Sequence, residues 1–168
     1  MRERANPKGY TLTVKEVDDT LEILKFEWRR TGEGKIAAFA EVWVAEDQIE
    51  YILSGMISEA AEDVYGQVYE RIQSDVEDVI SDLRKETPIY LSEIVVQSAE
   101  NRGQGLGSEL MQELESELKK NGIDTIYLQA VPSQRAAWYQ RLGFSIVYPW
   151  DERYIEAHSL YPLLRKYI

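Results

Sequence analysis

The stretch "IVVQSAENRGQGLGSELMQELESELKK", from Ile94 to Lys120, constrains the fold most, because its pattern changes in the middle. It begins as an apolar run typical of a buried strand and ends with leucines at helical spacing. Three glycines stand at the joint, directly after Arg102: Gly103, Gly105 and Gly107. The sequence therefore predicts a strand, a glycine-rich loop and a helix in direct succession.

A joint of this kind is typical of an anion-binding site. The first amides of a helix have no partners inside the helix, and the helix dipole adds partial positive charge there. Glycines let the backbone approach a phosphate, and Arg102 adds a formal positive charge. Two common phosphate loops fit poorly, because no lysine follows Gly107 and the glycine spacing is not G-x-G-x-x-G. We therefore expect a phosphate group held by a third kind of loop.

In the half of the chain before this stretch, the spacing of the apolar residues changes from one period to another. Polar and apolar residues first alternate, which predicts strands joined by short turns in an antiparallel meander. The expected strands are Tyr10 to Val17, Leu21 to Arg29, Ile36 to Ala45 and Ile49 to Leu53. Apolar residues then recur every three or four positions, which predicts a long helix from about Glu59 to Lys85.

The second half alternates strands and helices. The expected elements are the strand Ile89 to Gln97, the helix from about Gln104 to Lys120, the strand Thr125 to Val131, the helix from Pro132-Ser133 to about Arg141, and short strands near Ser145 to Tyr148 and Leu163 to Ile168. This order indicates an α+β (mixed α/β) fold with a central twisted mixed sheet flanked by helices. The length of 168 residues fits one domain over residues 1–168.

Composition excludes several classes of site. There is no cysteine and one histidine, His158, so disulfides, thiolate metal sites, a cysteine nucleophile and a His-rich metal cluster are excluded. The net charge of −11 disfavours nucleic acid. The same charge can serve solubility alone, or it can favour a cationic ligand or partner. No apolar run approaches the roughly 20 residues that span a membrane. The N-terminal residues carry no apolar signal segment, so we expect a cytoplasmic protein.

Two motifs together resemble the GNAT superfamily of N-acetyltransferases. Residues 102–107, "RGQGLG", match the family's R/Q-x-x-G-x-G/A loop, and Ala136 to Phe144, "AAWYQRLGF", match its Tyr-x-x-x-Gly-Phe helix. The resemblance covers Ile89 to Phe144 well and the remainder loosely. It implies the GNAT fold, acetyl-CoA as cosubstrate, no metal, and transfer of an acetyl group to a primary amine.

The resemblance also implies roles for single residues. In the family, the strand before the loop holds the pantetheine arm of coenzyme A, and the loop amides hold its pyrophosphate. The matching strand positions are Val95, Val96 and Gln97. The matching loop positions are Arg102, Gly103, Gln104, Gly105, Leu106, Gly107 and Ser108. Tyr139 matches the tyrosine that protonates the leaving thiolate, and an ordinary tyrosine pKa of about 10 keeps it protonated at neutral pH.

An amine must lose a proton before it attacks the thioester. Glu93 is the first candidate for this base, because a carboxylate buried in an apolar strand is a stronger proton acceptor. Glu41 and His158 are the alternatives. With no cysteine in the chain, we expect the amine to attack acetyl-CoA directly in a ternary complex.

The N-terminal half departs from the family pattern. Asp18-Asp19 leads almost directly into the next strand, where the family has two helices, and an unusual long helix precedes the cofactor-binding strand instead. The family therefore implies no particular acceptor, and the acidic composition predicts a cationic amine on a small molecule or a protein. Two alternatives stay open: a non-catalytic acyl-CoA-binding or protein-interaction domain, and a homodimer formed through the long acidic helix.

Overall fold

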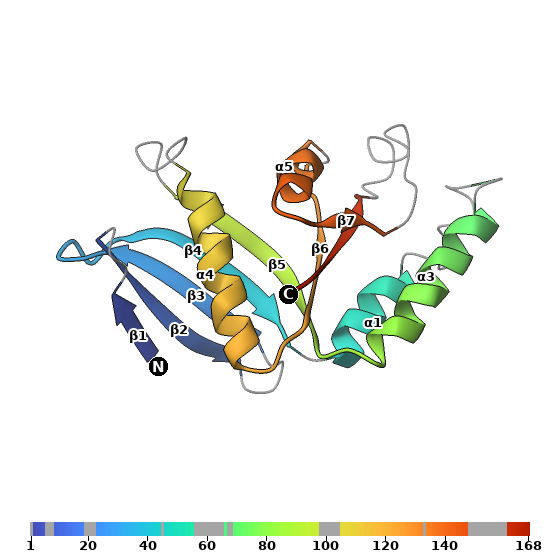
Figure 1. The fold of residues 1–168 in the computed structure, drawn as a ribbon, viewed down its shortest axis with the longest axis horizontal. Helices are drawn as coiled ribbons and strands as arrows, with labels where there is room; N and C mark the ends of the chain where they lie inside the picture. The colour runs from blue at the N-terminus through green and yellow to red at the C-terminus, as the bar shows by residue number, and fades with distance from the viewer. Residues whose placement is uncertain are drawn as a thin grey trace. The chain divides into compact units, whose positions relative to one another are not determined.

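The computed structural model describes residues 2–5, 9–18, 23–44, 46–55, 66, 69–97, 105–132, 134–147 and 161–168. These residues form two compact units, which are described separately (Figure 1). The first unit comprises Met1–Ala45 and Tyr90–Gly122, and the second comprises Glu46–Ile89 and Ile123–Ile168. The expectation of one domain over residues 1–168 stays a prediction.

The first unit is built on a run of antiparallel strands in the order β1-β2-β3-β4-β5. Their bounds are Arg2–Ala5 for β1, Tyr10–Asp18 for β2, Ile23–Arg30 for β3, Ile36–Trp43 for β4 and Pro88–Val96 for β5. The predicted meander is confirmed for β2, β3 and β4. Strand β1 was not predicted, because its sequence "RERA" shows no apolar alternation.

One face of this sheet is apolar and lies against helix α4, Leu106–Lys120 (Figure 1). The side chains of Phe26 and Trp28 are buried on it, as the period of two predicted. Helix α4 buries its apolar stripe: Leu106, Leu110, Met111, Leu114 and Leu118. The Trp28 Nε1 group donates a hydrogen bond of 2.8 Å to Glu113 Oε2. This bond and the leucine stripe hold α4 against the sheet.

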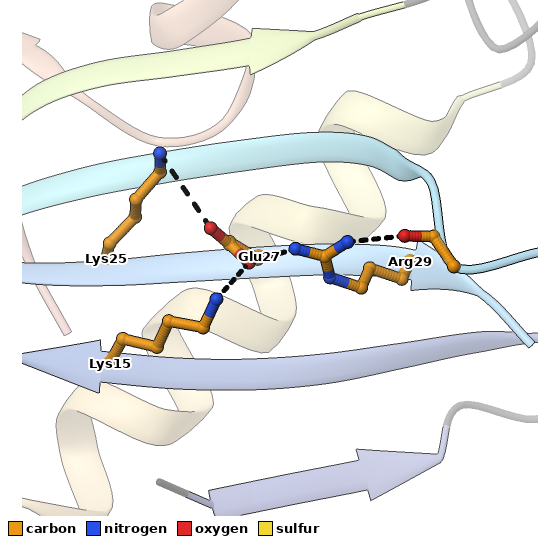
Figure 2. Close-up of polar contacts among 5 residues, drawn as sticks. Lys15, Lys25, Glu27 and Arg29 are labelled. Carbon is orange, nitrogen blue, oxygen red and sulfur yellow. Dashed lines mark hydrogen bonds and ion pairs between the residues drawn. The ribbon is translucent and has the colours of Figure 1, made fainter.

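The opposite face carries a cluster of charges around Glu27, whose side chain is only 6% exposed. Figure 2 shows three cations converging on it. Lys15 and Arg29 each approach Oε2 at 2.8 Å, Lys25 lies 3.8 Å from Oε1, and Arg29 also donates to the Gly34 carbonyl. Burial alone would raise the pKa of Glu27, but the hydrogen bonds and charges of Lys15 and Arg29 hold it below the ordinary value.

The substitution Glu27→Gln should therefore destabilise the protein in a pH-dependent way. A carboxylate with a lowered pKa stabilises the fold at pH values above its unfolded pKa, and this contribution is lost as the pH falls through the folded pKa. We expect the variant to lose about 1–3 kcal/mol of unfolding free energy at neutral pH. The difference from wild type should shrink as the pH falls below about 4. Urea unfolding of both proteins at several pH values measures it, and a pH-independent difference would contradict the ion-pair account.

The second unit contains a helical pair, a short sheet and helix α5. Its elements are α1 Glu46–Gly55, α3 Tyr69–Leu83, β6 Thr125–Gln129, α5 Arg135–Arg141, β7 Ser145–Ile146 and β8 Leu163–Tyr167. Strand β8 lies between β6 and β7 and is antiparallel to both. Helices α1 and α3 contact each other and bury apolar side chains. None of the helices in the described ranges is long and apolar enough to cross a membrane.

Two sequence predictions are wrong in the helical segment. The expected strand Ile49 to Leu53 is part of helix α1, with Ile49 and Leu53 fully buried and Tyr51 between them 82% exposed. In so short a run, periods of two and of four cannot be told apart. The helix expected from Glu59 to Lys85 is confirmed over α3, and residues 59–65, 67 and 68 lie outside the described residues. Gly66 has a φ of 52°, a left-handed conformation that interrupts a right-handed helix.

Polar contacts join the C-terminal end of α3 to the short sheet. The fully buried Tyr127 on β6 donates a hydrogen bond of 2.7 Å to Glu86 Oε2. Arg165 on β8 lies 3.2 Å from Asp82 Oδ2 in α3. Burial and the neighbouring Glu86 carboxylate raise the pKa of Tyr127, so its hydroxyl remains a donor. Tyr127 therefore has a structural role within this unit.

Candidate functional site

Strand β5, which was predicted to hold the cofactor, contains a β-bulge. Glu93 pairs with Glu41 and Leu91 with Val42, so Ser92 is an extra residue on β5. Leu91 is buried, whereas Ser92 and Glu93 are both exposed. The expected burial of Glu93 is therefore wrong, because the bulge interrupts the alternation of the strand and Glu93 lies on the polar face. Its role as a base stays a prediction.

The backbone of β5 divides the predicted cofactor residues between its two edges. The Gln97 amide donates a hydrogen bond of 2.9 Å to the Ala37 carbonyl on the β4 side. Because antiparallel pairing alternates, the backbone groups of Val95 also face β4, and those of Val96 face the other edge. The three predicted residues therefore do not present their backbone groups to a single edge of the strand.

The glycine loop leads into α4 through a left-handed residue. Gly105 is the N-cap residue, with φ 75° and ψ 4°, and this conformation favours glycine. The amide of Glu109 makes the first helical hydrogen bond, to the Gly105 carbonyl at 3.2 Å. The three amides before it, of Leu106, Gly107 and Ser108, have no acceptor within the helix, and Gly105 offers no side-chain cap.

These amides suit a diphosphate anion, because they point along the axis at the positive end of the helix dipole. Gly107 has no positive φ and lies in the first helical turn, so only Gly105 needs left-handed backbone among the described loop residues. Arg102, Gly103 and Gln104 lie outside the described residues.

Tyr139 projects from α5 into a buried aromatic group. Its side chain is 5% exposed and makes edge-on contacts with Trp138 and Phe144, with ring centroids 4.8 and 5.7 Å apart. The Phe144 amide donates to the Tyr139 carbonyl at 3.1 Å, and Gly143 before it has a φ of 93°. The Tyr-x-x-x-Gly-Phe motif is therefore a helix end that packs its own phenylalanine against the tyrosine.

The environment of Tyr139 maintains its protonated form. Burial raises the pKa of its hydroxyl, and the charge of Arg135 opposes this only in part. A phenol with a raised pKa remains protonated at neutral pH, so its hydroxyl is present as a hydrogen-bond and proton donor. The chemical state expected of an acid at this position is thus present.

The predicted site residues lie in both units. Glu93, the β5 positions and the described loop residues belong to the first unit, and Tyr139 belongs to the second. The structure brings together Glu93 and Glu41, which the sequence presented as separate candidates, and places them in register on adjacent strands. No short sequence motif indicates which residues of two strands stand opposite each other. His158 lies outside the described residues, within which three or more metal-ligating side chains do not gather.

Comparisons with known proteins agree with this geometry. The family model described as "Acetyltransferase (GNAT) domain" matches residues 38–146. Similar solved structures include Tetrahymena GCN5, with 10% identity and a TM-score of 0.52 over 88% of this chain and 69% of that one. The Drosophila melanogaster polyamine N acetyltransferase has 14% identity and a TM-score of 0.51 over 85% of this chain and 71% of that one.

The mosquito protein described as "arylalkylamine N-Acetyltransferase like 5b" has 14% identity and a TM-score of 0.57 over 86% of this chain and 74% of its own. A search of curated protein sequences finds no match. The structural likeness confirms the mixed α/β fold that the sequence predicted.

Proposed function

The chain belongs to the acetyltransferase (GNAT) family, and we propose that it transfers the acetyl group of acetyl-CoA directly to a primary amine of a cationic acceptor. Acetyl-CoA is the acetyl donor of this family. The observation that supports this chain's use of it is the N-terminus of α4. There Gly105 turns the chain and three consecutive amides without helical acceptors begin the helix.

Two different sets of described residues would bind the pyrophosphate and the pantetheine arm of coenzyme A. The amides of Leu106, Gly107 and Ser108 would hold the pyrophosphate, which needs several fixed donors and a positive potential. The end of β5, at Val95, Val96 and Gln97, would lie along the pantetheine arm, as the likeness to the family implies. Both elements lie in the same compact unit, so one rigid surface would position the donor.

The proposed reaction removes two protons from the acceptor nitrogen and adds one proton to the CoA sulfur. Glu93 would accept a proton from the ammonium group, which frees the nitrogen lone pair to attack the thioester carbonyl carbon. When the carbon–sulfur bond of the resulting tetrahedral intermediate breaks, the thiolate would receive the proton of the Tyr139 hydroxyl. The nitrogen would then give its second proton to the Tyr139 phenolate, which leaves the neutral amide and restores the phenol. The chain has no cysteine to form a thioester of its own, which supports direct transfer.

The charge of the chain supports a cationic acceptor. A net charge of −11 raises the local concentration of cations and disfavours phosphate-rich polymers. Two of the structural neighbours are named for polyamine and arylalkylamine acceptors. We propose an acceptor of this general class for the present chain, and a cytoplasmic location with access to acetyl-CoA.

Two measurements test the proposal in sequence. Acetyl-CoA at a hundred times its Kd should raise the unfolding free energy by roughly 2.7 kcal/mol, seen as a higher midpoint in thermal unfolding. A panel of amines should then reveal acceptors through release of free CoA. No thermal shift at millimolar acetyl-CoA would contradict cofactor binding. A thermal shift without CoA release from any amine would instead favour a non-catalytic acyl-CoA-binding domain.

A further inference from the structure

Two carboxylates face each other across the β4–β5 pair. Glu41 and Glu93 are register partners in the first unit, and both side chains lie on the face opposite α4. Counting by two along β5 from Gln97, which bonds to Ala37, makes them a hydrogen-bonded pair with Cα atoms roughly 5.5 Å apart. Glu93 is exposed and Glu41 is half-buried, so both are open to solvent.

Among the described residues, the cation in register with Glu41 does not neutralise the pair. Lys25 is the register partner of Glu41 on β3, but its ammonium group lies 3.8 Å from Glu27 and 4.7 Å above the Phe39 ring. Within the described residues no ion pair reaches Glu41 or Glu93. Like charges directly opposite each other in a sheet cost stability. The pair is therefore complementary to a ligand with more than one positive charge.

An aromatic pair continues the same two strands. Trp43 and Tyr90 are the next same-face partners beyond the bulge, with ring centroids 6.1 Å apart. The Trp43 indole Nε1 donates to Glu41 Oε1 at 3.4 Å, which orients the carboxylate beside the ring. Trp43 is half-buried, so part of its surface is accessible. A carboxylate beside an accessible indole suits an alkylammonium group, which gains both an ion pair and a cation–π contact.

We propose that Glu41 is a specificity-determining residue that selects an acceptor with two amino groups. One amino group would give its proton to Glu93 and attack the thioester. The second would remain an ammonium ion, bound by Glu41 and the Trp43 ring. Because the two carboxylates stand on adjacent strands, the acceptor is a diamine with a short aliphatic chain, or a peptide that offers two neighbouring amino groups. This inference rests on the proposed function, which supplies the reacting amine.

The test compares two amines of equal chain length, putrescine and n-butylamine, which differ in the second amino group. Their affinities are measured by isothermal titration calorimetry with the enzyme saturated with free CoA, so that no turnover occurs. Wild type should bind putrescine about tenfold more tightly than butylamine or better. Glu41→Gln should abolish this preference, because putrescine loses the partner of its second ammonium group. The control Glu16→Gln, an exposed carboxylate on β2, should keep the preference.

Three results would overturn the inference: equal affinities in wild type, a preference that survives in Glu41→Gln, or no binding of either amine. Because Glu41→Gln removes a like-charge pair, we expect it to fold with at least wild-type stability, and urea unfolding checks this. A failure of the proposed function is distinguishable, since it would appear as absent CoA release while the selective binding of putrescine persists.

Discussion

Replacing Tyr139 by phenylalanine will lower kcat about 100-fold or more while acetyl-CoA binds with unchanged affinity. The substitution removes only the hydroxyl, and the aromatic contacts with Trp138 and Phe144 remain. Without the phenol, the thiolate of CoA must leave with its charge unneutralised. Steady-state kinetics with the best acceptor and calorimetric titration with acetyl-CoA measure the two quantities.

Tyr127→Phe is the matched control for this experiment. Tyr127 is also a buried tyrosine of the second unit, but its hydroxyl donates to Glu86. We expect this variant to lose about 1.5–3 kcal/mol of unfolding free energy, because it removes a hydrogen bond to a charged group. Its kcat should stay near that of wild type. Equal kcat values in Tyr139→Phe and wild type would remove Tyr139 from the mechanism.

Replacing Gly105 by valine will weaken acetyl-CoA binding by about 10- to 100-fold. A β-branched residue is strained at a φ of 75°, so the backbone before α4 must change and the first amides of the helix must move. Loss of one hydrogen bond to a phosphate accounts for about 1.5–3 kcal/mol, which corresponds to this change in Kd. Calorimetric titration with acetyl-CoA measures the change.

Gly122→Val separates this effect from a general loss of stability. Gly122 follows the C-terminal end of the same helix with a φ of 81°, and like Gly105 it has open space where a Cβ would stand. Each variant should lose about 1–3 kcal/mol of stability. Only Gly105→Val should bind acetyl-CoA weakly. Equal Kd values for the two variants would show that the N-terminus of α4 does not hold the cofactor.

The sequence predicted those parts of the fold whose signals are local. The meander, α4 and α5 each combine a clear period with recognisable ends, and each is present. The signal was ambiguous for Ile49 to Leu53, because these residues fit a strand and a helix equally well. The exposure of Tyr51 in the structure distinguishes the two. Strand β1 depends on pairing with β2 rather than on any pattern of its own.

The residues of the candidate site likewise include some whose position the sequence predicted and some whose position it could not predict. Gly105 and Tyr139 belong to motifs whose spacing predicts where each residue lies relative to a helix. The sequence alone was therefore sufficient to place these two residues. The exposure of Glu93 was not predictable, because it depends on the bulge at Ser92, and a single extra residue interrupts the alternation of a strand. The opposition of Glu41 and Glu93 depends on register between segments about fifty residues apart, which composition and spacing do not determine.

If an amine attacks acetyl-CoA directly, the protein itself never carries the acetyl group, and mass spectrometry tests this. The protein is incubated with isotope-labelled acetyl-CoA, first alone and then with an amine that promotes CoA release. Direct transfer predicts an unchanged protein mass without the amine, and afterwards one labelled acetyl group on the amine for each CoA released. A protein that gains the labelled acetyl group and passes it on, or CoA release without an acetylated amine, would contradict the account.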